Sequence, residues 1–311
     1  MNFRETVAPL LERYWRSVPA NYRGAFWMML SAISFIIVQS LTKTLGHKFD
    51  SFQIAFFRAL FGGLAVLPFL LSRGFAAYRT PNLPFHLGRG LFGAAAIYLM
   101  VFAVIHMPIA DATVIGFTRT LFMIFLAVLF LGEVVRWRRW TATLAGFAGV
   151  VVMMRPGDET FQLAALAALG ASLCFASAHV CIKKCTARAD HPMTVQTYYW
   201  TTASLLTLVP GLLVWVQPSA WEFGVLVLMG VMSGLAQTCI VYSLRVGEAT
   251  FVHPFDYTRL IWAALAGWIL FAEPLGAMTA LGALLIIGSN LYIVRREAFE
   301  RRRADRSGKK A

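Results

Sequence analysis

Two stretches of the sequence share one pattern: ADATVIGFTRTLFMIFLAVLFLGE at 110–133 and TFVHPFDYTRLIWAALAGWILFAE at 250–273. A helix needs about 20 mostly apolar residues to cross the ~30 Å hydrocarbon core of a membrane, and each stretch is long enough. Each holds an arginine at the same place, Arg119 in the first and Arg259 in the second, and a glutamate at its end. The two stretches therefore predict a membrane-spanning helix that occurs twice in the chain.

The rest of the chain is equally apolar. Of its 311 residues, 59% are hydrophobic and 14% are charged, whereas soluble proteins have about a quarter charged residues. This excludes a soluble enzyme and a DNA-binding module. The apolar windows are continuous rather than alternating, which favours helices over barrel strands. We predict an all-α integral membrane protein with ten transmembrane helices, at 24–44, 52–72, 85–106, 110–131, 138–155, 161–182, 193–216, 222–244, 249–271 and 275–294.

The repeat extends beyond the two quoted stretches. Ser34-Phe35 and Lys43 recur as Cys174-Phe175 and Lys183, again 140 residues later. Because five helices are an odd number, the second copy must cross the membrane in the opposite sense, as an inverted repeat. The chain is thus predicted to comprise a cytoplasmic amphipathic leader (1–23), a first five-helix repeat (24–155), a second one (161–294) and a basic cytoplasmic tail (295–311).

The net charge of +13 is explained by where the basic residues lie. If the N-terminus is cytoplasmic, 21 of the 28 lysines and arginines fall on the cytoplasmic side and only Lys48 and Arg155 fall on the other. Positive charge favours the cytoplasmic side, so we predict a multi-pass inner-membrane protein with both termini in the cytoplasm. The basic face and tail are expected to contact anionic lipid headgroups rather than nucleic acid.

The cysteines give no metal-binding pattern. Cys174, Cys181, Cys185 and Cys239 form no CxxC pair, and buried cysteines behave as small hydrophobic residues. We therefore expect neither a metal nor a cofactor. The chain also has no ATP-binding P-loop, so the energy for any transport would come from a gradient. Small residues such as Gly230 and Gly234 allow close helix contacts, and they leave open whether the protein is a monomer or a homodimer.

Several loose motifs occur in one order in the two copies. They are Pro108–Ala112, Leu131-Gly132-Glu133, Arg139-Trp140, Gly146–Val151 and Arg155-Pro156-Gly157 in the first copy, and Ala249 through Glu273-Pro274 to Leu291 in the second. With the ten predicted helices and the duplication, this set resembles the EamA branch of the drug/metabolite transporter superfamily. The resemblance covers about residues 22–295.

The resemblance implies an inner-membrane secondary transporter of a small organic metabolite that works by alternating access of its two halves. It favours an amino acid or an amino-acid-derived compound such as S-adenosylmethionine, with riboflavin transport or drug/metabolite export as alternatives. Family members line their central cavity with spans 1, 3, 4, 6, 8 and 9. The alternatives of a different class are an intramembrane enzyme and a non-transporting scaffold. Neither is favoured, because the chain has no HExxH motif and a scaffold needs no paired arginines.

Charged residues inside spans are candidates for function, because they are costly in the membrane. Arg119 and Arg259 are equivalent in the repeat and are expected to face one another. Asp256 lies three residues before Arg259, on the same helix face, whereas its equivalent in the first half is Gly116. Two arginines and one acid leave room for an anionic substrate group. Alternatively, Asp256 and Arg259 neutralise each other while Arg119 bonds backbone carbonyls.

Weaker candidates surround this group. Phe117 and Tyr257 could stack on the substrate, and Asp256 and His253 are candidates for proton coupling. Other polar side chains on the expected cavity-lining spans are Tyr98, His179 and Gln237. Two further expectations concern charges nearer the span ends: Arg58 and Arg89 should reach the lipid headgroups, while Glu133 and Glu273 could take part in gating or in structural ion pairs.

Overall fold

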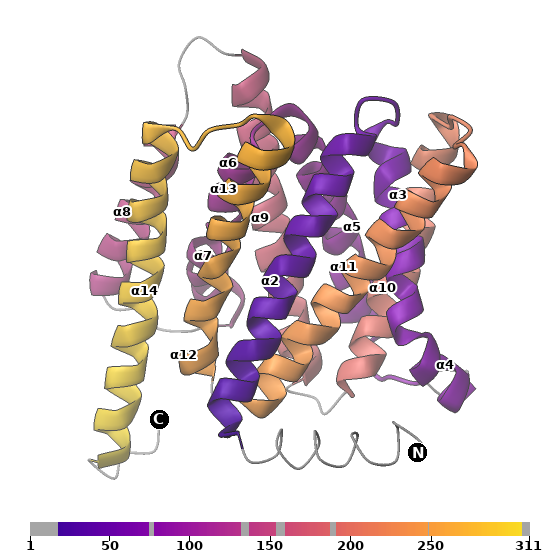
Figure 1. Cartoon of the computed structure of the whole chain (residues 1–311). Coiled ribbons are helices and arrows are strands. Elements are labelled where there is room, and N and C mark those ends of the chain that lie inside the picture. The colour runs from indigo at the N-terminus through magenta and orange to yellow at the C-terminus, as the bar shows by residue number, and fades with distance from the viewer. Residues whose placement is uncertain are drawn as a thin grey trace, which may run out of the picture.

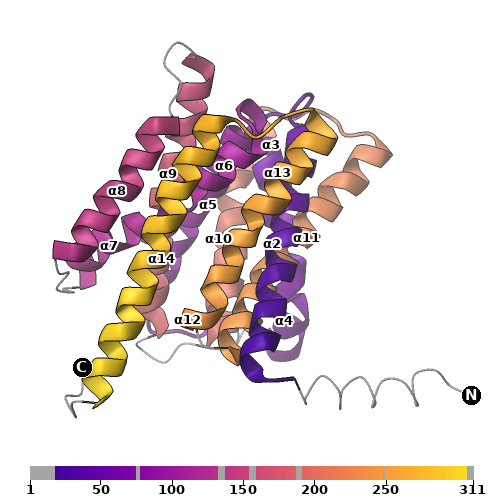
Figure 2. The same ribbon diagram turned by 60° about the vertical axis from the view of Figure 1, so that its left-hand side comes forward.

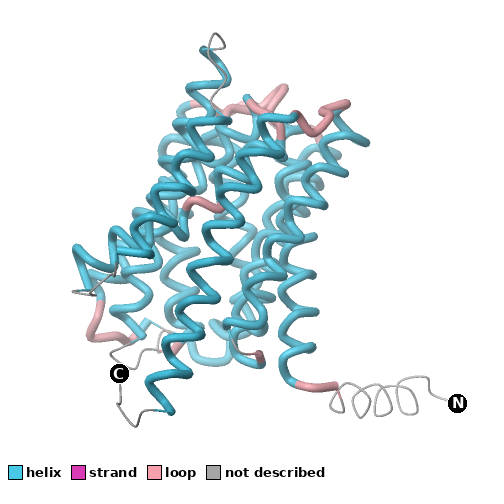
Figure 3. The backbone as a smooth tube through the Cα atoms, turned by 90° about the vertical axis from the view of Figure 1, so that its left-hand side faces the viewer, coloured by secondary structure: helices cyan, strands magenta, loops and turns pink. Residues whose placement is uncertain are grey.

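The computed structural model describes residues 18–74, 78–131, 137–153, 159–186, 191–247 and 249–306. Within these ranges every regular element is a helix, as the colouring of Figure 3 makes plain. Residues 1–17 of the predicted leader lie outside the described residues, and so does Glu133. Ala20 already begins the first described helix, earlier than predicted, and the last helix runs on through most of the predicted tail to Arg306.

Helices occupy all ten predicted windows. They are α2 (Ala20–Leu45), α3 (Ser51–Gly62), η1 (Gly63–Val66), α4 (Leu67–Arg73), α5 (Leu83–His106), α6 (Ile109–Gly116), α7 (Arg119–Leu131), α8 (Trp137–Met153), α9 (Glu159–Thr186), α10 (Pro192–Leu213), α11 (Ala220–Val246), α12 (Ala249–Val252), η3 (His253–Tyr257), α13 (Thr258–Phe271) and α14 (Ala277–Arg306). Most of them run between the upper and lower ends of the molecule in Figure 1.

Five helical stretches of the described residues are long and apolar enough to cross a membrane: Ala20–Leu45, Leu83–His106, Ile109–Phe130, Thr160–Cys185 and Ala220–Val246. Two shorter apolar stretches, Trp140–Met153 and Ala277–Ile293, accompany them. The protein is therefore a helical membrane protein. The count of ten crossing helices stays a prediction.

Two of the predicted spans are interrupted at equivalent places. The span at 110–131 breaks between α6 and α7, at Phe117 and Thr118, and the span at 249–271 passes through the tighter 3-10 turn η3. Pro254 explains the second break, because proline has no N–H to donate to the preceding turn. The first copy has no proline here; its break follows Gly116, a residue that is a poor helix former.

The helices pack as pairs across the chain. α2 packs against α11, α5 against α9, α3 against α10 and α11, and α8 against α14; the α8–α14 pair forms one flank of the molecule in Figure 2. One buried cluster includes Ile109, Ala168 and Ile286, and another includes Ile54 and Met229. Together these clusters fix the relative positions of the helices that carry the charged residues.

Candidate substrate site

The structure brings three of the predicted site residues into one cluster. Arg119 begins α7, Asp256 lies in η3 and Arg259 is the second residue of α13. Arg119 Nη2 lies 2.8 Å from Asp256 Oδ2, and Arg259 Nη2 lies 2.6 Å from Asp256 Oδ1. One carboxylate thus binds both guanidinium groups. The Asp256–Arg259 pair of the alternative is therefore present, but Arg119 pairs with Asp256 as well and is not bound to backbone carbonyls alone.

The helix breaks position this charged cluster. On the first copy, Thr118 Oγ1 donates to the carbonyl of Ile115 at 2.6 Å. On the second, Thr258 Oγ1 donates to the carbonyl of Phe255 at 2.7 Å. Both hydroxyls thereby satisfy a carbonyl at the break, and α7 and α13 each start directly afterwards. Helix N-termini carry a partial positive charge, so two of them add to the positive potential around Asp256.

Burial strengthens the electrostatic interactions of these charged side chains. The side chains of Asp256 and Arg259 are 9% and 10% exposed, while that of Arg119 is 27% exposed. Two guanidinium groups against one carboxylate leave one surplus positive charge, and arginine can bind a carboxylate or phosphate through two parallel hydrogen bonds. Arg119 is the more accessible of the two cations and is the better placed to meet an anion.

Aromatic rings line the cluster. The rings of Phe117 and Tyr257 meet edge to face with centroids 5.0 Å apart. The guanidinium carbon of Arg259 lies 4.4 Å from the centroid of the Phe35 ring, on α2. Asn290 on α14 donates to the carbonyl of Phe117 at 3.2 Å. Residues of α2, α7, η3, α13 and α14 therefore meet at this point.

The other predicted site residues lie on separate helices. Tyr98 on α5 stacks on Phe52, with centroids 3.9 Å apart and an angle of 6° between the rings. His179 is exposed on α9, and Gln237 is half-buried on α11. The side chain of His253 lies outside the described part of the chain, so its predicted role in proton coupling stays a prediction.

A second ion pair holds the upper end of the same helices together, and we call it the Lys43–Glu273 clamp. Lys43, near the end of α2, pairs with Glu273, just after α13. Lys43 Nζ also donates to the carbonyl of Met107 at 2.8 Å, and Glu273 Oε2 accepts from the backbone N–H of Ile109 at 3.2 Å. The clamp joins helices of the two predicted repeats at the end of α2 that lies uppermost in Figure 1. The sequence signal for it is that both residues recur 140 positions away.

Two buried arginines overturn a prediction. Arg58 and Arg89 were expected to reach the lipid headgroups, but both residues are 6% exposed. Arg58 Nε donates to Ser233 Oγ at 3.1 Å, and Arg89 stacks over the ring of Tyr199 at 4.4 Å. The positions of Arg58 and Arg89 near the span ends are compatible both with reaching the headgroups and with burial inside the protein. The helix face on which each arginine lies decides between these two outcomes.

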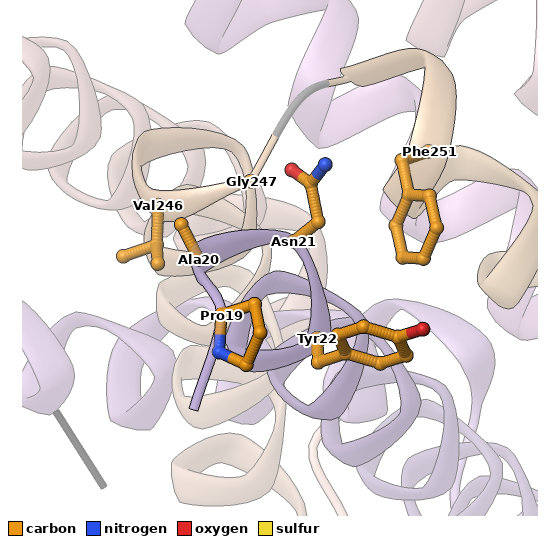
Figure 4. A pocket seen from close by; sticks show the side chains of 7 residues that line it. All are labelled: Pro19, Ala20, Asn21, Tyr22, Val246, Gly247 and Phe251. Atoms are coloured by element: carbon orange, nitrogen blue, oxygen red, sulfur yellow. The ribbon is translucent and has the colours of Figure 1, made fainter. Parts of the chain in front are cut away.

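A pocket of about 530 Å³ lies at the lower end of the molecule, away from the cluster. It is formed by the start of α2, the end of α11 and the start of α12, and Figure 4 shows Tyr22 and Phe251 on its wall. The residues that line it are Pro19, Ala20, Asn21, Tyr22, Val246, Gly247 and Phe251. They include no charged side chain, so the pocket does not share the chemistry of the cluster.

The family model of the EamA-like transporters matches this chain twice, at residues 22–155 and 162–295. The chain belongs to the EamA-like transporter family. This EamA-like protein is 29% identical over 271 residues to the S-adenosylmethionine uptake transporter of Rickettsia prowazekii, covering 87% of this chain and 92% of the relative. It is 32% identical over 279 residues to the riboflavin transporter of Rhizobium johnstonii, covering 88% and 91% of the two chains.

The fold also occurs among solved structures, and one of these is a crystal structure. It aligns with a TM-score of 0.59 and 20% sequence identity, covering 89% of this EamA-like chain and 98% of the other. The family and its named relatives identify a membrane transporter of small molecules, not an intramembrane enzyme. The resemblance predicted from the sequence motifs is confirmed.

Proposed function

We propose that this EamA-like protein is an inner-membrane secondary transporter of a small organic metabolite that carries a carboxylate. The observation that supports this proposal is the cluster in which Arg119 and Arg259 share Asp256. Its surplus positive charge would bind an anionic group of the substrate. Binding energy in such a site favours a ligand that supplies the missing negative charge, because an unbalanced charge in a dry interior is costly.

The substrate class we favour is an amino acid or an amino-acid-derived compound such as S-adenosylmethionine. Such compounds carry an α-carboxylate, and relatives named for S-adenosylmethionine uptake cover most of the chain. Riboflavin is the alternative to a carboxylate-bearing substrate, because it has no carboxylate and would contact the cluster through neutral polar groups. The edge-to-face rings of Phe117 and Tyr257 beside the cluster favour a flat ring, and relatives named riboflavin transporters are similarly close in sequence. Export is a further alternative, as in the pseudopaline exporter of Pseudomonas aeruginosa, which is 27% identical.

We propose that the chain is built from two inverted five-helix repeats, 24–155 and 161–294. The two matches of the family model support this division. The packing supports this division as well. In the proposed repeat, α2 is equivalent to α9, α3 to α10, α5 to α11 and α7 to α13. The α2–α11 contact then corresponds to the α9–α5 contact, and the α3–α11 contact corresponds to the α10–α5 contact. In the same way the α13–α2 contact becomes the α7–α9 contact. Alternating access by rocking of the two halves follows from such symmetry.

We also propose ten membrane crossings with both termini in the cytoplasm. The first turn of α2 and the last turn of α14 lie at the same end of the molecule (Figure 1), which supports an even number of crossings. The count of 21 basic residues on one side against two on the other supports the orientation. The basic side, including the tail at 295–311, would then contact anionic lipid headgroups.

The Lys43–Glu273 clamp would act as a gate in this scheme. It joins α2 and the start of α6, from the first repeat, to the end of α13, from the second. A transporter that rocks between two states must break such contacts at one end when that end opens. Asp256, and His253 three residues before it in the sequence, are our candidates for coupling to protons, because protonation of Asp256 would release both arginines.

Counterflow into proteoliposomes tests the proposal. Purified protein is reconstituted, loaded with an unlabelled compound and offered the labelled form of S-adenosylmethionine, single amino acids or riboflavin. We expect exchange of at least one of them, and at least about a tenfold loss in Arg119→Gln and Arg259→Gln if each guanidinium makes a charge-assisted bond to substrate. Arg245→Gln removes an exposed positive charge at the end of α11 and serves as the matched control. Wild-type exchange in both site variants would contradict the proposed site.

Proton coupling has its own measurement. In Asp256→Asn the side chain cannot change its charge, so uptake driven by an imposed pH gradient should fall to the level found without a gradient. Counterflow needs no net proton movement and should be reduced less. An undiminished response to the pH gradient would remove Asp256 from the coupling mechanism.

A further inference from the structure

Hydrogen bonds from two other helices reach the helix break of the first copy. Asn290, on α14, donates through Nδ2 to the carbonyl of Phe117 at 3.2 Å. Ser172, on α9, donates through Oγ to the carbonyl of Ile115 at 3.2 Å. Both Ser172 and Asn290 are fully buried. Two carbonyls at the junction of α6 and α7 thus receive side-chain donors from distant parts of the chain.

The backbone hydrogen bonds at this break follow the 3-10 pattern. The N–H of Thr118 donates to the carbonyl of Ile115 at 2.9 Å, and the N–H of Thr120 donates to that of Phe117 at 3.2 Å. Each of these bonds spans three residues, whereas a bond in an α-helix spans four. The carbonyls that leave the α-helical pattern are therefore the same two that receive the side-chain donors.

The second copy has a local cause for the same turn. The N–H of Thr258 donates to the carbonyl of Phe255, and Pro254 has no N–H to give to the preceding turn. The first copy has Val114 at the place of Pro254, and it has no proline anywhere in 109–131. Its backbone therefore has every N–H group that a continuous α-helix needs, and local sequence alone does not account for its break.

The two side-chain donors occur in one copy only. The residues at the places equivalent to Ser172 and Asn290 are Ala32 and Val150. Because a carbonyl only accepts, the amide atom of Asn290 that meets it is the nitrogen, and Oδ1 is left buried with no hydrogen-bond partner among the described residues. An unpaired buried oxygen costs stability, and valine at this position would avoid that cost. Packing of α14 alone therefore does not explain the amide.

We propose that Asn290, assisted by Ser172, is a positioning residue of the substrate site. By binding the carbonyl of Phe117 it holds the break open, and the break places Arg119, two residues further on, against Asp256. This inference rests on the proposed function, because Asn290 would affect transport through Arg119. It also extends the site to α14, a helix outside the expected cavity-lining spans.

Loss of the Asn290 amide has a definite structural consequence. Without this donor, the carbonyl of Phe117 can accept from the N–H of Leu121, and α6 and α7 join as one α-helix. The rotation per residue then falls from about 120° in a 3-10 helix to about 100° in an α-helix. Over the two residues of the break, Arg119 turns by roughly 40°, or roughly 4 Å at a side-chain radius of about 6 Å. Such a shift breaks the 2.8 Å contact between Arg119 and Asp256.

Hydrogen–deuterium exchange of peptides across 115–121 tests the inference without any transport. We expect exchange in Asn290→Val to be roughly 2- to 10-fold slower than in the wild type, the factor for one net hydrogen bond, because amides of this segment gain α-helical acceptors. Ser172→Ala should slow exchange less, because the carbonyl of Ile115 keeps the hydroxyl of Thr118. Faster or unchanged exchange in Asn290→Val would overturn the inference, because loosened packing alone speeds exchange.

Matched control variants remove a hydroxyl from the same two helices. Ser289→Ala removes one that bonds within α14, and Ser177→Ala removes one that bonds within α9. Both controls should exchange across 115–121 as the wild type does. If Asn290→Val does not fold, Ser172→Ala must still slow the exchange relative to the controls, and its failure to do so would overturn the inference.

Counterflow tests whether Asn290 acts through Arg119. For the compound that the wild type exchanges, Asn290→Val should raise the half-saturating concentration about tenfold, the loss of one charge-assisted contact, without lowering the thermal unfolding midpoint. On the residual exchange of Arg119→Gln, adding Asn290→Val should change this concentration less than about twofold, because residues that act together are not additive. Additive effects would contradict the positioning role. Lack of exchange of any compound by the wild type would contradict the proposed function, while hydrogen–deuterium exchange would still decide whether Asn290 holds the break.

Discussion

Breaking the Lys43–Glu273 clamp should open the upper end of the protein. The side chains of Lys43 and Glu273 are 13% and 18% exposed, so the pair is largely removed from water. Truncating one partner of a buried ion pair costs about 3–5 kcal/mol, because the other charge is left unpaired. Water still reaches both side chains here, and we therefore expect roughly 2–3 kcal/mol for Glu273→Ala, a figure at or below the lower end of that range.

That energy predicts a measurable shift in conformation. At about 1.4 kcal/mol for each factor of ten, 2–3 kcal/mol changes the ratio of open to closed molecules roughly 30- to 150-fold. The backbone N–H of Ile109 donates to Glu273 at 3.2 Å and is therefore a direct reporter. Hydrogen–deuterium exchange of peptides that contain Ile109 should be faster by about this factor in Glu273→Ala, provided that exchange occurs through opening of the clamp.

Three variants separate the parts of the clamp. Glu273→Gln keeps an oxygen that can accept from Ile109 but loses the ion pair, so its exchange should be intermediate. Lys43→Met loses the ion pair and the bond to the Met107 carbonyl together. Lys48→Met is the control, because it breaks an ion pair in which Lys48 is 47% exposed, and exposed pairs contribute little. Exchange at Ile109 that is the same in Glu273→Ala, Lys43→Met and the control would refute the reasoning.

Three other perturbations have definite expected outcomes. Asp256→Asn leaves two cations without a carboxylate and should lower the free energy of unfolding by about 3–5 kcal/mol. Asp256→Glu keeps the carboxylate and should retain most of the wild-type free energy of unfolding, as chemical denaturation would show. Gly93→Ala places a Cβ 2.3 Å from a ring atom of Tyr199 and should cost about 1–3 kcal/mol, whereas Gly288→Ala has open space around it and should leave the thermal midpoint unchanged or slightly higher. Pro254→Ala should let η3 continue as α-helix and displace Asp256, so that counterflow falls about tenfold or more without loss of stability.

The sequence was sufficient to place the helices along the chain. Length and continuous apolarity define a membrane helix, because every backbone hydrogen bond must be made inside the segment. Pro254 likewise accounts for the 3-10 turn η3, since a missing N–H has a local effect. The break between α6 and α7 was not predicted, because Gly116 only weakens a helix and tertiary contacts decide whether it bends there.

The faces of the helices could not be predicted in the same way. Arg58 and Arg89 lie on helices that are apolar all round, so no amphipathic pattern says which side faces lipid. An arginine near a span end can reach the headgroups or turn inward, and its sequence position is the same in both cases. The recurrence of Lys43 and Glu273 140 positions away marks both residues in the sequence, but their pairing could not be predicted, because it depends on how the end of α2 meets the end of α13.

The difference between the two repeats, rather than their likeness, gives the charged cluster its chemistry. Thr118 and Thr258 make the same hydroxyl-to-carbonyl bond at the two helix breaks. The two stretches therefore share the helix break and the arginine that follows it. Gly116 occupies the place in the first repeat that Asp256 occupies in the second. A second carboxylate would neutralise both arginines and remove the attraction for an anion, whereas no carboxylate would leave two unbalanced cations in a dry interior. One acid for two arginines holds the cluster together and, in the proposed function, would leave a charge for the substrate to balance.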